Sequence, residues 1–387
     1  MVAFGFVSLS ADMVYEGMRS IAGPFLGTLG ASALTVGIIT GAGEAIALAL
    51  RLVTGPLADR TSRHWALTII GYALTAVCVP LLAVTPFLGA AGLAVASALI
   101  LAERTGKAVR SPSKSALLAE MAVPVGRGRG FGVHKALDQV GAFAGPLVIA
   151  GVAALSGRIW LGFLVLAVPG AVSLMLLTQL RRHSPAEPGR ASPRNPPSMP
   201  GESRLPLEFY LFAAACAAAT LGLMTFGVIS YAVVSAGLVR TSVVPLLYAA
   251  AMAVGAVSAL STGLLYDRIG ARVLYALPVL VAGVPALVFR PTLAAVIVGL
   301  MLWGLATGVQ DSTVKALVAD LVPRRALATA YGVFAAAQGA AALAGGVLAG
   351  ALYGDHLRLL VTIIVVLQVA SLALLSAALR LRHAALV

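Results

Sequence analysis

Acidic and basic side chains lie in the middle of long apolar segments of this chain, where charged residues are rare. Asp12, Glu16 and Arg19 follow one another at helical spacing, so on a helix they share one face. Glu44 and Arg51 likewise share one face of the next apolar segment. A carboxyl group in apolar surroundings that faces an arginine can take up or release a proton when its surroundings change. These residues are therefore candidates for proton transfer.

A later apolar segment adds a further acidic residue, Asp138. At about 1.5 Å per residue, Asp12 and Glu44 both fall roughly 15 Å along their segments, near the middle of a bilayer. The candidate proton-coupling or substrate-binding residues are therefore Asp12, Glu16, Arg19, Glu44, Arg51 and Asp138. An alternative stays open, in which the same charges form a permanently paired network that only fastens the segments together.

The elements that must position these residues are long apolar helices. Hydrophobic residues make up 60% of the 387 residues and charged residues only 11%, whereas soluble proteins average about 25% charged residues. At about 20 residues per span, the chain has room for twelve transmembrane helices. We place them near residues 2–28, 34–58, 65–86, 88–110, 129–156, 158–180, 208–236, 241–265, 272–290, 292–311, 327–354 and 358–379. The fold class that we expect is an all-α integral membrane protein.

A polar loop recurs about half a chain apart. Its first copy consists of Gly55, Asp59, Arg60 and Arg63. Its second copy consists of Gly263, Asp267, Arg268 and Arg272. A loop repeated between apolar segments at this spacing indicates two homologous halves, arranged as a parallel repeat. We expect six helices over residues 1–180, a linker rich in Pro, Ser and Arg over 181–206, and six helices over 207–387.

The formal net charge of +13 is explained by the distribution of the basic residues. Of the 27 Lys and Arg residues, those in the expected outer loops are Arg158, Arg240, Arg290 and Arg358. Most of the others lie in loops on the opposite side, which predicts that both termini and the linker are cytoplasmic. Because membrane topology accounts for the basic excess, we expect a lipid bilayer and no nucleic acid as partner.

Twelve spans, a central basic linker and the repeated polar loop resemble the major facilitator superfamily. In that family the loop has the pattern Gly-x-x-x-Asp-Arg-x-Gly followed by two basic residues. Here Ser62 replaces the second glycine of the first copy, and Ala271 replaces a basic residue of the second. The resemblance implies that these loops latch the cytoplasmic side of a transporter while its site faces outward. It also implies a multi-pass protein of the bacterial cytoplasmic membrane that works as a monomer.

The fifth predicted span carries a second family pattern, which consists of Gly132, Gly141, Gly145 and Pro146. It resembles the signature of superfamily members that exchange drugs or metabolites for protons. The resemblance implies secondary active transport of a small molecule by alternating access, with proton antiport in the direction of efflux. Few polar residues lie in the second half, so we expect an amphipathic substrate that faces Phe226, Tyr231, Tyr248 and Trp303, unless these side chains pack in the core or face lipid.

Other functions stay open on the same scaffold. They include proton-coupled or uniport uptake of a small metabolite, lipid scrambling, sensing, and catalysis by a membrane-embedded transferase. We expect no enzyme, because no motif such as His-Glu-x-x-His occurs. ATP is not expected to supply the energy, because Gly106-Lys107 lacks the upstream glycine of a phosphate-binding loop. With only Cys78 and Cys216 present, we expect neither a metal nor another cofactor.

Overall fold

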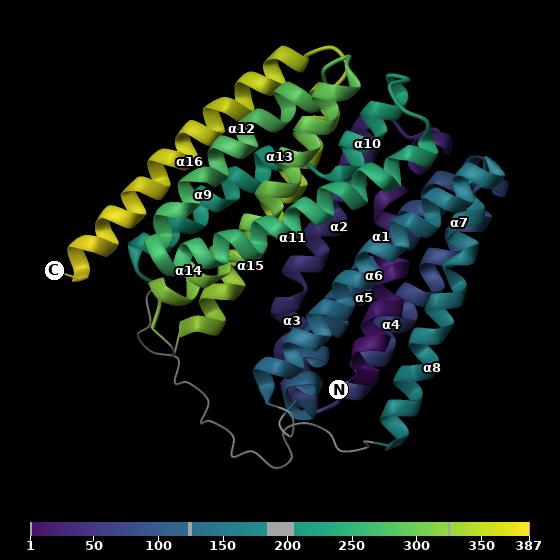
Figure 1. Ribbon diagram of the computed structural model, residues 1–387, viewed down its shortest axis with the longest axis horizontal. Coiled ribbons are helices and arrows are strands. Elements are labelled where there is room, and N and C mark those ends of the chain that lie inside the picture. Colours follow the sequence, from purple (N-terminus) through teal and green to yellow (C-terminus); the bar gives the residue numbers. More distant parts are fainter. Residues whose placement is uncertain (1, 123–125, 184–204, 324–325, 387) are drawn as a thin grey trace. The chain divides into compact units, whose positions relative to one another are not determined.

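The computed structural model consists of helices joined by short loops (Figure 1). It describes residues 2–122, 126–183, 205–323 and 326–386. No strand occurs within these residues, which confirms the all-α prediction. Most of the predicted linker, residues 184–204, lies outside the described residues.

Each predicted span coincides with one helix or with two consecutive helices. In the first part of the chain these are α1 (Val2–Thr28), α2 (Ala33–Ala49), α3 (Arg51–Thr61), α4 (His64–Leu81), α5 (Gly92–Met121), α6 (Arg127–Ser156), α7 (Ile159–Val165) and α8 (Ala167–His183). In the second part they are α9 (Leu207–Leu223), α10 (Phe226–Ser235), α11 (Val244–Ile269), α12 (Ala276–Val288), α13 (Leu293–Asp311), α15 (Leu327–Leu352) and α16 (Leu357–Leu386). One further helix, α14 (Thr313–Leu321), lies between the predicted spans 292–311 and 327–354. Short 3-10 helices are η1 (Leu82–Phe87), η2 (Gly89–Ala91), η4 (Thr241–Val243) and η5 (Gly270–Tyr275).

Two of the predicted spans differ from the structure in ways that bear on the site. The second span is interrupted at Leu50, between α2 and α3. The fourth span, expected to end near residue 110, continues as α5 to Met121. Falling hydropathy marks the depth at which a helix leaves the bilayer, whereas the helix itself ends only where its backbone hydrogen bonds end. The polar residues beyond 110 therefore extend α5.

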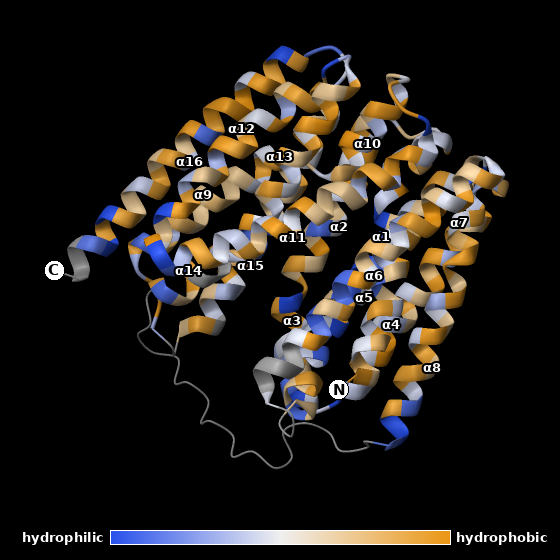
Figure 2. Ribbon diagram, viewed as in Figure 1, coloured by the Kyte–Doolittle hydropathy of each residue, from blue (hydrophilic) through white to orange (hydrophobic). Residues whose placement is uncertain are grey.

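Nine stretches of the described chain are long and apolar enough to cross a membrane. One of them, Thr241–Val288, contains two predicted spans. Neither α1 nor α5 is among the nine, because each carries charged residues near its middle. Figure 2 shows this contrast, with apolar residues along most of α12 and hydrophilic residues on α5. The charged helices are therefore the exceptions in an apolar fold.

The helices pack into two compact units. Unit 1 comprises Met1–Ala31, Ile46–Pro197 and Thr241–Ala249. Unit 2 comprises Ser32–Ala45, Ser198–Arg240 and Ala250–Val387. The helices α2 and α11 thus each contribute residues to both units, whereas the other long helices of the described chain belong to one unit each.

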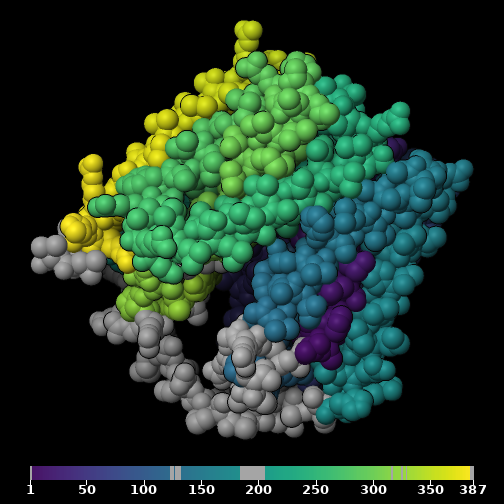
Figure 3. Space-filling view, in the orientation of Figure 1, coloured from purple at the N-terminus to yellow at the C-terminus, as the bar shows by residue number. Residues whose placement is uncertain are grey.

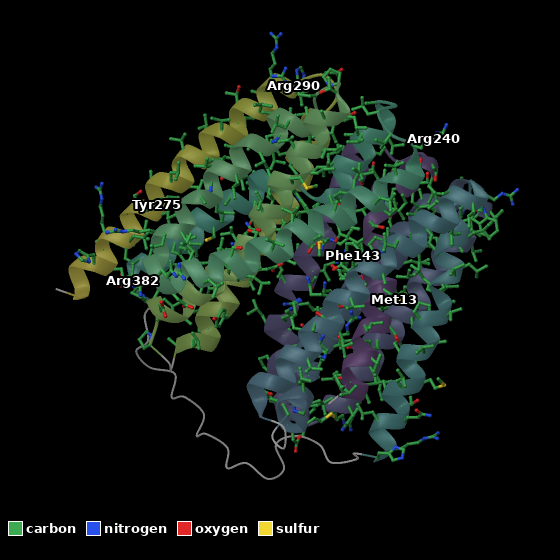
Figure 4. The ribbon with its side chains drawn as sticks, viewed as in Figure 1. Met13, Phe143, Arg240, Tyr275, Arg290 and Arg382 are labelled. Carbon is green, nitrogen blue, oxygen red and sulfur yellow. The ribbon has the colours of Figure 1, made fainter. Side chains whose placement is uncertain are left out.

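Unit 1 is built around α1, which packs most closely against α6. A core of large apolar side chains includes Phe4, Trp65, Tyr72 and Leu177. The glycines of α6 bring its backbone against that of α1. A Cβ atom at Gly145 would lie 2.2 Å from the carbonyl oxygen of Met13, which is labelled in Figure 4. Such contacts fix the separation of the two helices, because no larger residue fits there.

Gly141 of α6 provides a test of this packing. A Cβ atom there would lie 2.1 Å from the carbonyl oxygen of Leu9, whereas one at Gly151 would meet nothing within 4 Å. We expect Gly141→Ala to destabilise the protein by about 1–3 kcal/mol through overpacking. The matched variant Gly151→Ala is expected to unfold at the same temperature or higher, because alanine favours a helix by roughly 1 kcal/mol over glycine. Thermal unfolding of both purified variants in detergent measures the difference, and equal effects would contradict the close α1–α6 contact.

Unit 2 contains α9, α12, α13, α15 and α16, together with residues 33–45 of α2. In Figure 3, α16 forms a long edge of the surface of this unit. The α2 segment packs against α15 through glycines, since a Cβ atom at Gly37 would lie 2.0 Å from the carbonyl oxygen of Gly346. The hydroxyl groups of Thr40 and Thr225 lie 2.7 Å apart and add a hydrogen bond within the unit.

A proline in α5 is compensated by a hydrogen bond from α3. Pro112 has no N–H group, so the carbonyl oxygen of Ala108, four residues earlier, loses its partner within the helix. The hydroxyl group of Thr54 in α3 donates to this oxygen at 3.0 Å. Threonine thereby satisfies the acceptor that the proline leaves open, as is common in membrane proteins.

Candidate functional site

Asp138 of α6 lies at the centre of a polar cluster in unit 1. The hydroxyl group of Ser8 donates to Asp138 Oδ1 at 2.7 Å, and Lys135 Nζ donates to Oδ2 at 3.1 Å. Lys114 Nζ of α5 lies 3.8 Å from Oδ1 and donates to Ser8 Oγ at 3.2 Å. Because the Asp138 side chain is only 15% exposed, these contacts offset the cost of burying its charge. We call Ser8, Asp12, Lys114, Lys135 and Asp138 the Asp138 cluster.

Asp12 brings a second carboxyl group to this cluster. It lies on α1, one helical turn after Ser8, and interacts directly with Asp138. The positive charges of Lys114 and Arg110 also act on it. Two neighbouring carboxylates repel each other, and one proton shared between them removes that repulsion. The chemistry open to the cluster is therefore the uptake and release of a proton.

Glu16 lies on the same helix but makes different contacts. Its Oε2 atom is 3.8 Å from Arg19 Nη1 and accepts a hydrogen bond from the hydroxyl group of Tyr248. Tyr248 belongs to the beginning of α11, which is part of unit 1. Glu16 and Tyr248 are both buried. Of the aromatic residues expected to face substrate, Tyr248 thus contacts the charged face of α1, whereas Trp303 is buried against Phe226 in unit 2.

Glu103 and Arg104 of α5 form a buried ion pair, with 3.7 Å between Arg104 Nε and Glu103 Oε2. Thr75 of α4 donates to Glu103 Oε1 at 3.0 Å. Arg104 also donates to the hydroxyl group of Tyr15 on α1. Glu103 is fully buried, at 0% exposure. These contacts connect α1, α4 and α5, and they have the character of a structural link within unit 1.

Glu44 and Arg51, predicted to share a face, lie on either side of the break at Leu50. Glu44 lies in the part of α2 that belongs to unit 2, and Arg51 begins α3 in unit 1. Both side chains are half-buried. Leu50 itself keeps right-handed helical dihedral angles, and its N–H group donates to the carbonyl oxygen of Ile46 at 3.1 Å. That the two side chains share a face therefore stays a prediction.

The two repeated polar loops share one backbone feature. Ser62 follows α3 with a φ of 50°, and Gly270 follows α11 with a φ of 65°. Glycine adopts this left-handed conformation without strain, which is why the family pattern has glycine at this position. The charged residues of the loops are exposed, namely Asp59, Arg60, Arg63, Asp267, Arg268 and Arg272. Close packing does not require the first glycines, since a Cβ atom at Gly55 would lie 4.0 Å from Pro112 and one at Gly263 would meet nothing within 4 Å.

The glycine pattern of the fifth span lies along α6. Gly141 and Gly145 contact the backbone of α1, as described above, and Pro146 is buried beside them. Gly132, near the beginning of the helix, would meet nothing within 4 Å if it carried a Cβ atom. Two residues of the pattern therefore set the contact between the helices that carry Asp12 and Asp138.

Comparison with known proteins identifies the family. A model of the Major Facilitator Superfamily matches residues 4–289 and 240–385 of the chain. The chain belongs to the Major Facilitator Superfamily. The predicted resemblance is thereby confirmed, and with it the expected class of protein, a multi-pass membrane transporter.

Relatives of this superfamily member span nearly its whole length. An uncharacterized protein of Mycobacterium tuberculosis is 48% identical over 378 residues, which cover 97% of this chain and 91% of the relative. An uncharacterized MFS-type transporter of Methanocaldococcus jannaschii is 26% identical over 358 residues, which cover 90% of this chain and 87% of the relative. A crystal structure of a mutant of the nucleoside transporter NupG shares the fold, with a TM-score of 0.75, 13% identity and 98% of both chains covered.

Several residues of the site in this superfamily member escape the sequence analysis. Arg110 stands at the predicted end of the fourth span and Lys114 beyond it, so neither is among the predicted intramembrane candidates, whereas α5 continues past both. Ser8 is a common residue in an apolar helix and carries no charge to signal its contact with Asp138. The spacing of Lys107, Arg110 and Lys114, at three and four residues, is the signal that could have revealed them, because it places all three on one helix face.

Proposed function

We propose that the protein is a proton-coupled secondary transporter whose proton site is the pair Asp12 and Asp138. The observation that supports this proposal is the direct interaction of two carboxyl groups in an apolar fold, beside Lys114. Asp138 keeps 15% exposure of its side chain, so protons have a route to it, whereas Glu103 is fully buried in its pair with Arg104. The other predicted acids, Glu16 and Glu44, stay candidates with a supporting role.

Packing suggests how proton binding is coupled to movement. Asp12 and Asp138 are carried by α1 and α6, whose backbones touch at Gly141 and Gly145. A shift of one helix against the other changes the separation of the two carboxyl groups, and with it the advantage of sharing a proton. Conversely, loading the proton removes a repulsion between the helices. This reciprocity is what coupled transport requires.

We further propose antiport in the direction of efflux, with a small amphipathic molecule as substrate and a monomer in the cytoplasmic membrane. The fifth-span pattern around Gly141 and Gly145 supports exchange for protons. The proposed orientation has both termini cytoplasmic. It agrees with Figure 4, in which Arg240 and Arg290 lie at one end of the helices of unit 2 and Arg382 lies at the other. The latch at the two repeated polar loops and the division into halves at residues 181–206 remain parts of this proposal.

Reconstituted transport tests the proposal. The purified chain is placed in liposomes that contain a pH-sensitive dye, and proton gradients of either direction are imposed. A panel of lipophilic cations, organic anions, antibiotics and small metabolites is then added. We expect at least one compound to elicit proton movement, with a sign that fixes antiport or symport. The exposed-loop variant Asp355→Asn serves as a control and is expected to behave as the wild type. A folded protein that moves no protons with any compound would contradict proton coupling.

A further inference from the structure

A row of basic residues follows one face of α5. It consists of Arg104, Lys107, Arg110 and Lys114, separated by three, three and four residues. Arg104 is paired with Glu103, and Lys114 with Asp138. Lys107 and Arg110 have no carboxylate within 4.0 Å among the described residues. This row on α5 thus includes two cations whose counter-charge the described side chains do not supply at ion-pair distance.

Both cations are held in place by neutral groups. Lys107 Nζ lies 3.5 Å from the ring centre of Tyr15, and Arg110 Cζ lies 4.7 Å from the ring centre of Tyr72. Arg110 also donates from Nη1 to the hydroxyl group of Thr75 and, at 3.4 Å, to the carbonyl oxygen of Gly71. Within the described chain both of these hydrogen bonds start at Nη1, which leaves the donors of Nε and Nη2 for a ligand. The guanidinium group of Arg110 is therefore held in position but still has hydrogen-bond donors to offer a ligand.

The burial of these cations favours an anionic ligand. Arg110 is only 4% exposed, and Lys107 is half-buried. A cation taken out of water is costly unless an anion accompanies it, and Asp12 acts on Arg110 only from beyond ion-pair distance. Side chains three residues apart on a helix lie about 5–6 Å apart at Cβ, so a single acidic group can contact both. Arginine binds carboxylates and phosphates through two parallel hydrogen bonds, whereas lysine adds a point charge.

We propose that the substrate carries a carboxylate or phosphate group, which binds between Lys107 and Arg110. This inference rests on the proposed transport function and adds the charge of the substrate to it. An amphipathic substrate of this kind is an organic anion, with its acidic group at α5 and its apolar part directed away from the row of cations. The acidic group could be that of a soluble molecule or that of a lipid headgroup, and the experiment distinguishes these two sources.

Four probes that share one ring and differ in charge provide the test. Benzoate, phenyl phosphate, benzamide and benzylammonium are titrated into the purified full chain in a neutral detergent, and binding is measured by calorimetry and by thermal unfolding. We expect the two anions to bind and the neutral and cationic probes not to bind. Lys107→Gln and Arg110→Gln should each raise the Kd of the anions by about 10-fold or more, which corresponds to loss of one charge-assisted hydrogen bond. Lys107→Arg keeps the charge and should retain binding.

Matched controls make the outcomes decisive. Arg358→Gln removes an exposed cation elsewhere and should leave the Kd unchanged. If Arg110→Gln does not fold, Lys107→Gln alone decides, because Lys107 is half-buried and lies over the ring of Tyr15. Binding of benzamide as tight as that of benzoate, absence of binding by both anions, or unchanged Kd values in the folded glutamine variants would overturn the inference.

Two further comparisons distinguish a lipid headgroup from a soluble anion, and the anionic substrate from the proposed proton coupling. If phosphatidylglycerol, but not phosphatidylcholine, abolishes benzoate binding in the wild type and is itself bound less tightly by Lys107→Gln, the site accepts a lipid headgroup. If neither lipid interferes, the anion is soluble. Anion binding in a protein that never moves protons would contradict the proposed coupling alone. Proton movement driven only by neutral or cationic compounds would contradict the anionic substrate alone.

Discussion

Asp138→Asn is expected to abolish substrate-dependent proton movement while leaving a folded protein. Asparagine has nearly the same shape and can still accept the hydrogen bond that Ser8 donates at 2.7 Å. Asparagine cannot share a proton with Asp12, so the cluster no longer has a carboxyl pair that alternates between a protonated and a deprotonated form. Removal of one partner of a buried ion pair costs about 3–5 kcal/mol at full burial, and we expect less here because the side chain of Lys135 is 68% exposed and can return to water.

Two assays on this variant separate coupling from folding. Net proton movement is followed with the pH-sensitive dye in liposomes, and exchange of labelled substrate for unlabelled substrate is followed without a proton gradient. Exchange requires no net transfer of a proton, so it should persist in Asp138→Asn when proton movement has fallen to background. A purely structural role for Asp138 would reduce both activities together. Proton movement at the wild-type rate in the folded variant would show that another group carries the proton.

Gly346→Val is expected to reduce transport by roughly 10- to 100-fold, as a change of about 1–3 kcal/mol in one conformation would do. A Cβ atom at this position of α15 would lie 2.3 Å from the carbonyl oxygen of Gly37 in α2. The branched side chain of valine therefore prevents residues 32–45 from packing in unit 2. Glycine is required here because two backbones approach each other, as happens at close helix crossings in membranes.

A matched substitution near the end of the same helix serves as control. Gly354 lies just beyond α15 and would meet nothing within 4 Å if it carried a Cβ atom, so Gly354→Val should transport as the wild type does. Substrate exchange in liposomes and thermal unfolding in detergent are measured for both variants. If Gly346→Val matched the wild type in both measurements, the close contact between α2 and α15 would have no role in the transport cycle.

Much of the fold follows from hydropathy and repetition alone. The all-α class and the superfamily are evident in the sequence, because a bilayer requires long apolar helices and the repeated polar loop resembles the pattern of that family. The structure also explains why the family pattern has a second glycine in the polar loop. Ser62 adopts the left-handed conformation that its counterpart Gly270 adopts more easily.

The site was less accessible to sequence reasoning, because periodicity reveals which residues share a face but not what that face meets. Asp12 and Glu16 share a face of α1, yet one meets Asp138 of α6 and the other meets Tyr248 of α11. These partners lie far away in the sequence, and no local pattern connects them. Lys114 was not predicted as part of the site because hydropathy falls before it, near residue 110, whereas α5 continues as a helix to Met121.

The proline of α5 has a consequence for water in the membrane. Because Pro112 opens the carbonyl oxygen of Ala108, the hydroxyl group of Thr54 is the partner that this oxygen has in the described structure. A carbonyl group that is buried away from water without a hydrogen bond costs several kcal/mol, and Ala108 is fully buried. For this reason α3 cannot simply withdraw from α5 and leave a dry gap. Any departure of α3 must admit a water molecule to take the place of the threonine. Separation of α3 from α5 therefore requires local hydration, and a water molecule bonded to the carbonyl oxygen of Ala108 would indicate that the two helices have separated.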